Sequence, residues 1–437
     1  EVTVSKARNS IIKLEWSTSL EQNCFEFFSP SNIRKSLNLY WTIWHPNVNI
    51  IHRPTFNSCK VKPELLAAMV IIGACVSPDE TDKKRATEWF NCVEEVVFMD
   101  DDLCAEPLYV LENSVPVPSL QERKVQALQA AYVVCLYQNW EGGDSGKRRI
   151  RRFRFGFMVA IIRDIGLSSV VHSRCSTFND SHFDWRTFAL REQLIRVVTW
   201  IFLLDHAFSI FNNLPPRMVI KEMKAQVAWP EACFQAPTAQ SCQAEIQKWL
   251  HTCPDSALLT ISDAIIMILK VEMTDVTVFN LASLGPLNLF AFISAFHTLI
   301  FQYQNAIIGN GQLAAISQGL SNWRGIWEVY SARFSSTPPH VMVDAENVTA
   351  ETAWQRTGFM RFSPEYWLLA RLMVDRLQHN EMMQVENSLL PSATSSTTSG
   401  GPAIVNPDLA EYDQTSMQQV NELISELKKI NIHQHDA

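Results

Sequence analysis

One long apolar helix limits the folds that this chain can adopt. It lies in the stretch Arg191–Met218 and is predicted to stop in the sequence Asn-Asn-Leu-Pro-Pro-Arg. Apolar residues stand at positions 190, 194, 197, 201, 204 and 208, and alternating steps of four and three place them on one helix face. From about Val197 onward the other faces are apolar too, so we expect the helix to lie inside a larger structure. Asp205 is the only ionised residue there. Because an unpaired buried carboxylate is very unfavourable, Asp205 must have a partner.

The composition predicts an all-α fold. Hydrophobic residues make up 47% of the 437 residues, only 14 are glycine, and long apolar runs keep helical spacing. A chain of this length can bury one large core or two medium ones. The net charge of −8 argues against a nucleic-acid-binding surface over the whole chain, since such surfaces are normally basic.

Composition also divides the chain into segments. We expect a linker over 1–22, a large helical domain over 23–385, a flexible linker over 386–407 rich in Ser, Thr, Gly and Pro, and an amphipathic helix over 408–437. The large domain could consist of two helical subdomains that meet near 230–255, where the apolar pattern weakens. The last helix would dock on the core or pair with another chain.

A second apolar run, Leu284–Tyr303, is long enough to cross a membrane. No charged side chain occurs between Asp275 and Arg324. Helix-breaking and polar residues nevertheless interrupt the run: Pro286, Asn288, His297 and Gln302. We therefore expect a buried central helix and no membrane partner.

Cysteine and histidine spacing predicts no metal site in this chain. The ten cysteines never form a Cys-x-x-Cys pair, and most lie in apolar helical stretches, where a reduced thiol packs as a small hydrophobic group. His45, His52 and Cys59 are spaced too widely to supply the close ligand pair that metal sites usually have. The same holds for Cys242, His251 and Cys253.

Two charged runs stand out. The basic cluster places six cations in eight positions and suggests a nuclear-import signal or a phosphate-contacting patch: Lys147, Arg148, Arg149, Arg151, Arg152 and Arg154. The alternative is a solvated helix start. The acidic run Asp100–Asp102 is expected to be a solvated helix end.

Nothing in the sequence indicates catalysis. It contains no Gly-x-Ser-x-Gly elbow, no phosphate-binding Gly-rich loop and no His-Glu-x-x-His motif. Asp205 and His206 are adjacent on one helix and point to different faces, so they cannot act together directly. We expect no enzyme activity.

Four segments together resemble the fungal-specific transcription factor domain, also called the middle homology region. They are Trp44–Phe56 (WHPNVNIIHRPTF), Arg163–Leu167, the helix of Trp200 and Asp205 with its Leu214–Arg217 turn, and Trp323–Trp327 followed by Gly358–Trp367. Their order and spacing match the family over roughly residues 25–380.

The resemblance implies an all-helical regulatory domain in the nucleus, which controls RNA polymerase II transcription of a metabolic or biosynthetic pathway. It implies DNA binding through a zinc module located before Glu1, and no cofactor in this chain itself. The chain begins at Glu1 rather than methionine, so we expect a longer gene product. Expected partners are a small-molecule effector or coregulator protein and a second copy of the chain.

Two other functions stay open from the residues alone. The chain could be a helical enzyme for an apolar small molecule, with the charge-free region 276–323 as its pocket wall. It could also be a non-catalytic scaffold that contacts DNA complexes through the basic cluster.

Overall fold

The computed structural model describes residues 11–14, 17–104, 118–172, 183–306, 312–334 and 352–389. Within these residues the fold is all-α, as predicted: no β-strand occurs, and one isolated bridge joins Gln226 to Thr260. The predicted linker over 386–407 and the tail helix over 408–437 lie largely or wholly outside the described residues.

The first part of the fold runs to the long central helix. Its elements are α1 (Thr18–Phe27), α2 (Pro30–Leu39), the π-helical η1 (Tyr40–Trp44), η2 (Arg53–Thr55), α3 (Pro63–Cys75), α4 (Glu80–Phe98), α5 (Asp101–Cys104), α6 (Pro118–Trp140), α7 (Asp144–Arg149), the π-helical η4 (Ile150–Arg154), α8 (Phe155–Ile165), η5 (Leu167–Ser169) and α9 (Trp185–Asn212).

The second part covers the other side of α9. Its elements are η7 (Ile220–Glu222), α10 (Glu231–Phe234), α11 (Ala239–Thr252), η8 (Pro254–Leu258), α12 (Ile261–Ile268), α13 (Asp275–Ala282), α14 (Pro286–Gln304), α15 (Gln312–Arg333), η10 (Ala353–Gln355), η11 (Phe359–Phe362) and α16 (Ser363–Leu389).

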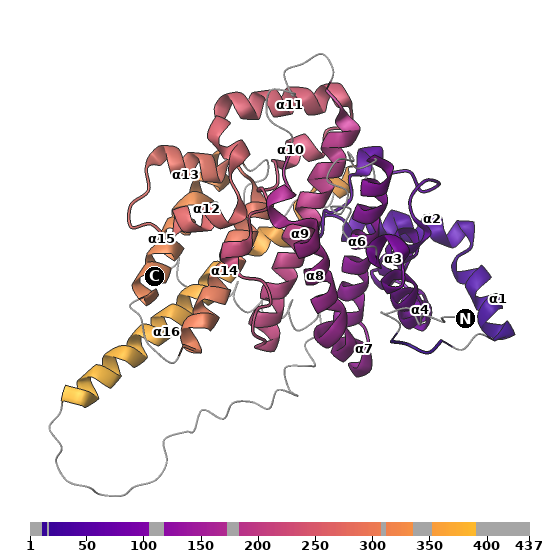
Figure 1. Cartoon of the computed structure of the whole chain (residues 1–437), viewed down its shortest axis with the longest axis horizontal. Helices are drawn as coiled ribbons and strands as arrows, with labels where there is room; N and C mark the ends of the chain where they lie inside the picture. Colours follow the sequence, from indigo (N-terminus) through magenta and orange to yellow (C-terminus); the bar gives the residue numbers. More distant parts are fainter. Residues whose placement is uncertain are drawn as a thin grey trace, which may run out of the picture.

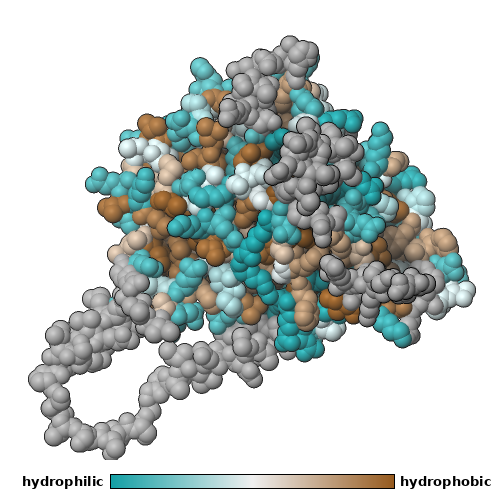
Figure 2. Space-filling model, in the orientation of Figure 1, coloured by the Kyte–Doolittle hydropathy of each residue, from teal (hydrophilic) through white to brown (hydrophobic). Residues whose placement is uncertain are grey.

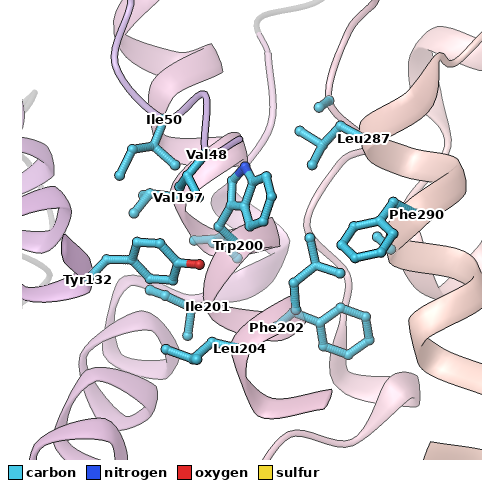
Figure 3. Close-up of a cluster of buried hydrophobic side chains, with 14 of the residues drawn as sticks. Val48, Ile50, Tyr132, Val197, Trp200, Ile201, Phe202, Leu204, Leu287 and Phe290 are labelled. Atoms are coloured by element: carbon cyan, nitrogen blue, oxygen red, sulfur yellow. The ribbon is translucent and has the colours of Figure 1, made fainter. Parts of the chain in front are cut away.

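Helix α9 lies at the centre of the molecule, between α6 and α14 (Figure 1). Asp184 caps its start by accepting hydrogen bonds from two backbone N–H groups, and Asn213 ends it in the left-handed conformation, with φ of 49°. Figure 3 shows Tyr132 of α6 and Phe290 of α14 on opposite sides of Trp200. The predicted buried helix is confirmed.

Asp205 has the partners that its burial requires. One carboxylate oxygen accepts the backbone N–H of Arg217 at 3.1 Å, and the other accepts that of Met218 at 2.7 Å. Burial nevertheless raises the pKa of Asp205 to about 6, because two neutral donors compensate only part of the lost hydration. The carboxylate therefore holds the turn after α9 against the helix.

The apolar run that suggested a membrane span forms α14, which is buried over most of its length. Among the described helices α9 is long and apolar enough to cross a membrane. Helices α13 and α14 would form another span if the pair, bent by 110°, counted as one. In α9, 78% of the most apolar window is buried inside the fold, as in a core helix. Figure 2 shows polar and apolar residues mixed over one outer face.

Three local expectations differ from the structure. The acidic run is not wholly solvated, because Asp100 is buried: it lies 2.7 Å from the ammonium of Lys62 and accepts the backbone N–H of Leu103 at 3.0 Å. The charge of Lys62 compensates the lost hydration of the carboxylate. Helix α1 begins at Thr18, inside the expected linker over 1–22. Helix α16 continues to Leu389, past the expected start of the linker at 386.

One hydrophobic cluster contains side chains from α1 through α16. The described residues on both sides of 230–255 thus contribute to a common core. The proposed division into two subdomains stays a prediction.

Helices α2 and α3 approach so closely at Gly73 that a side chain has no room. A Cβ atom there would lie 2.1 Å from the carbonyl oxygen of Ser36. We expect Gly73→Ala to lower the free energy of unfolding by about 2 kcal/mol or more, because the backbones must separate. Urea denaturation measures the effect.

Gly325→Ala is the matched control, because Gly325 also lies within a helix and a Cβ there has nothing within 4 Å. This variant should be neutral or stabilising by up to about 1 kcal/mol, since alanine favours the helix. Equal stability of the two variants would contradict the close packing of α2 on α3.

Candidate functional site

The basic cluster does not form one surface. Arg154 is buried, with its guanidinium 3.0 Å from Glu94 and 2.6 Å from Glu95. Arg149 lies 2.9 Å from the same Glu94 carboxylate, and Arg151 donates to the side-chain oxygen of Asn139 at 2.7 Å. These three arginines stabilise the contact of η4 and α7 with α4 and α6.

The other three cations of the basic cluster are accessible. Arg148 and Arg152 are exposed, and Lys147 is half-buried. Any phosphate contact or import receptor would have to use this smaller set. The nuclear-import signal and the phosphate-contacting patch stay predictions, now with Arg148 and Arg152 as the residues to change.

The chain entering from the N-terminal side contacts the same ionic network. The backbone N–H groups of Ile11 and Ile12 donate to the two carboxylate oxygens of Glu95, at 2.9 and 3.2 Å. Because Arg154 also binds Glu95, the charged pair fixes where this entering segment lies on α4.

A cavity of about 400 Å³ opens beside α9. This volume lies within the range of small-molecule pockets in proteins. The lining comes from seven elements and the turn after η1: Trp44, Asn47, Val48, Ile72, Cys75, Val76, Tyr132, Leu136, Tyr137, Trp140, Glu141, Trp200, Leu203, Leu204, Ala207, Ile210, Phe211, Phe290, Ser294, Phe359, Arg361, Phe362 and Tyr366. We call it the α9 cavity.

Most groups that face the α9 cavity are aromatic or aliphatic. Cys75 is the thiol among them, and burial raises its pKa to about 12, so it stays protonated and poorly nucleophilic. The indole nitrogen of Trp44 is buried and has no hydrogen-bond partner among the described residues. Arg361 and Glu141 are exposed residues of the lining and supply its charges.

A buried polar network holds the Trp200 wall of this cavity. The indole N–H of Trp200 donates to the side-chain oxygen of Asn49 at 3.2 Å, and the amide of Asn49 donates to Glu231 at 3.0 Å. Arg196, one turn before Trp200 on α9, lies 2.9 Å from Glu231 and 2.8 Å from Glu192. The orientation of Trp200 therefore depends on the Arg196 network.

The opposite wall is tied to the turn after η1. The backbone N–H of Gly358 donates to the carbonyl of Pro46 at 3.1 Å, and Arg356 donates to the carbonyl of Thr42 at 2.9 Å. A Cβ at Gly358 would lie 2.3 Å from the Pro46 oxygen, so this close approach requires glycine. These bonds bring Phe359 and Arg361 to the cavity.

Of the histidines and cysteines considered as metal ligands, His45, His52, Cys242 and Cys253 are buried, whereas Cys59 and His251 are exposed. His52 Nδ1 is 2.8 Å from the hydroxyl of Thr55, and His45 packs between aromatic rings. Cys242 donates to the carbonyl of Cys233 at 3.3 Å. Within the described residues no group of three or more metal-binding side chains comes together.

The sequence did not indicate the cavity or the Arg196 network. Glu192 and Arg196 stand four positions apart on a helix, a spacing that predicts an ion pair, and this signal was available. The cavity left no such signal, because its lining is assembled from segments between Trp44 and Tyr366. Phe290 and Ser294 are the residues of the charge-free region 276–323 that line the α9 cavity.

Comparison with known proteins gives two relatives and a domain. The fungal-specific transcription factor domain matches residues 37–263. The chain is 49% identical over 426 residues to transcription factor verF of Penicillium polonicum, covering 97% of this chain and 57% of that protein. It is 23% identical over 248 residues to zinc finger protein zas1 of Schizosaccharomyces pombe, covering 54% of this chain and 26% of that protein.

No solved structure matches the chain. The chain spans little more than half the length of verF and about a quarter of the length of zas1. The domain match covers three of the four segments on which the resemblance rested, and the match to verF extends over most of the chain. The chain therefore belongs to the family defined by the fungal-specific transcription factor domain.

Proposed function

We propose that this chain is the regulatory region of a fungal transcription factor that controls RNA polymerase II transcription in the nucleus. The observation that carries the proposal is the 49% identity to a protein named as a transcription factor, over 97% of this chain. The target genes would belong to a metabolic or biosynthetic pathway.

In this proposal DNA is bound by a zinc module that precedes the regulatory region in the gene product. The name of the second relative, a zinc finger protein, supports this arrangement. The net charge of −8 also favours a separate basic module as the DNA-binding part. The region itself has no catalytic role in this proposal, and it responds to an effector or coregulator and could pair with a second copy.

The test is chromatin immunoprecipitation of the full-length gene product in its fungal host. We expect enrichment at discrete promoters, with no sequence-specific DNA affinity of residues 1–437 alone. A protein that stays in the cytosol, with no chromatin enrichment under any growth condition, would overturn the proposal.

Nuclear accumulation of variants of the same full-length gene product tests the accessible part of the basic cluster. The double variant Arg148→Ala and Arg152→Ala removes exposed charges only, so its stability should change by less than about 0.5 kcal/mol. If these residues form the import signal, the variant loses nuclear accumulation. Lys84→Ala with Arg85→Ala is the control, because these cations on α4 are also exposed and lie outside the cluster. Equal nuclear accumulation of both variants would remove the import signal from this site.

A further inference from the structure

The α9 cavity joins the two parts of the fold. Its walls come from the turn after η1, α3, α6 and α9 on one side, and from α14, η11 and α16 on the other. A molecule bound there would contact both parts at once. Its binding energy would therefore favour the packing in which Phe290 and Phe359 face Trp200 and Tyr132.

The lining selects for an apolar, ring-containing molecule. Aromatic side chains from both parts of the fold supply much of the surface, and stacked or edge-on ring contacts add to the burial of apolar area. Figure 3 shows part of this wall, with Trp200 between Tyr132 and Phe290. A highly charged metabolite such as a nucleotide would lose too much hydration against these rings.

Among the polar groups of the lining, Trp44 and Arg361 are donors that a ligand could engage. The buried indole N–H of Trp44 has no acceptor among the described residues, and a buried donor without an acceptor is unfavourable. The guanidinium of Arg361 lies 4.8 Å from the ring centre of Phe362 and forms no ion pair among the described residues. A ligand acceptor would satisfy the indole N–H of Trp44, and an acidic group would pair with Arg361, whereas Glu141 would disfavour a second negative charge.

We propose that the α9 cavity binds an apolar, ring-containing small molecule that carries one acidic or strongly accepting group. The rings lie among Trp200, Phe290 and Phe359, and Arg361 binds the acidic group. The molecule acts as the effector of the regulatory region by stabilising one packing of its two parts. This last role rests on the proposed function, whereas the binding itself does not.

A matched pair of fluorescent probes tests the binding. Anilinonaphthalene sulfonate and phenylnaphthylamine share one ring system, and the sulfonate is their main difference. We expect both to bind residues 1–437 saturably, with one molecule per chain, and to compete with each other. Absence of saturable binding of either probe would overturn the proposal.

Two substitutions fill the cavity from opposite walls. Ala207→Phe on α9 and Ser294→Leu on α14 place added atoms in the cavity, and each should weaken both probes by about tenfold or more. Ala314→Phe on α15 is the control, because Ala314 is exposed and outside the lining. Thermal unfolding of each variant shows that the fold persists. If both filling variants keep their fold and their full affinity, the α9 cavity is not the binding site.

Arg361→Gln tests the acidic group. A lost charge-assisted hydrogen bond should weaken the sulfonate probe by about tenfold or more, and the neutral probe should keep its affinity within about twofold. Equal weakening of both probes would contradict the assigned role of Arg361.

These outcomes are independent of promoter binding. Failure of the probes with normal promoter enrichment would reject the ligand site and retain the regulator. Probe binding by a protein that never reaches chromatin would retain the site and reject the regulator.

Discussion

Lowering the pH from about 7.5 to about 5 is expected to reduce the free energy of unfolding by about 6 kcal/mol. Four histidines are buried and neutral in the fold: His45, His52, His206 and His297. Burial lowers the pKa of His45 and His206 to about 3 and that of His52 and His297 to about 4. The charge of Arg196 lowers the pKa of His45 and His52 further.

The direction follows from proton uptake. Below about pH 6.5 each imidazole of the unfolded chain binds a proton. In the folded chain these four histidines stay neutral until the pH of the solution approaches their lowered pKa values. At about pH 5 each histidine therefore favours unfolding by about 2 kcal/mol. Asp205 acts in the opposite sense. Because its pKa is raised to about 6 in the fold, the folded chain binds this proton at a higher pH than the unfolded chain, which stabilises the fold at pH 5 by about 1 to 2 kcal/mol. The net loss is comparable to the whole stability of many domains.

Urea denaturation at several pH values measures this dependence. His297→Gln should reduce the slope of the free energy of unfolding against pH by an amount that corresponds to about one proton. The glutamine keeps a donor for the carbonyl of Tyr366, which lies 2.9 Å from His297 Nε2. The exposed His251 supplies the control His251→Gln, because its ring already lies in solvent in the folded chain. A slope of one proton or less in the unsubstituted chain would show that these histidines are hydrated in the fold.

Apolar spacing predicted much of the helical architecture from the sequence. The apolar run around Val197 forms the centre of α9, and Gly166, in the segment Arg163–Leu167, has a φ of 82° after α8. These signals are local, since both helix periodicity and a glycine C-cap depend on a few neighbouring residues. The need of Asp205 for a partner was also predictable, although Arg217 and Met218 as donors were not.

Charge runs were less informative, because exposure depends on tertiary packing. Arg148 and Arg149 are neighbours in sequence, yet Arg148 is exposed and Arg149 pairs with Glu94. Which side of a helix turns inward was not readable from a run of cations, and π-helical geometry at η4 shifts the register further. The α9 cavity was out of reach for the same reason: Trp44 and Arg361 become neighbours of one cavity only through long-range packing.

Replacing Arg196 by alanine is expected to lower the free energy of unfolding by about 3 to 5 kcal/mol. Its guanidinium is fully buried and lies 2.8 Å from Glu192, 2.9 Å from Glu231 and 3.0 Å from the carbonyl of Trp229. The substitution leaves Glu192 buried with His172, at 2.7 Å, as its remaining ionisable partner. Arg196→Lys should also be destabilising, because an ammonium cannot reproduce the planar fork of donors.

Arg371→Ala is the control for charge removal. Arg371 pairs with Asp375 one turn later on α16, at 3.0 Å, and both side chains are partly exposed. Such a pair contributes about 0.5 kcal/mol or less. Urea denaturation compares the variants, and equal losses of stability for Arg196→Ala and Arg371→Ala would show that the Arg196 network is hydrated rather than buried.

The Arg196 network also connects stability to the α9 cavity. Glu231 binds both Arg196 and Asn49, and Asn49 accepts the indole N–H of Trp200. Loss of Arg196 frees Glu231 to move, so Trp200 loses the restraint that fixes one wall of the cavity. If the Arg196→Lys variant still folds, its affinities for the two fluorescent probes should therefore fall by similar factors. The change affects the apolar wall of the cavity and leaves Arg361 in place. Unchanged probe affinity in such a folded variant would show that packing against Phe290 alone holds Trp200 in place.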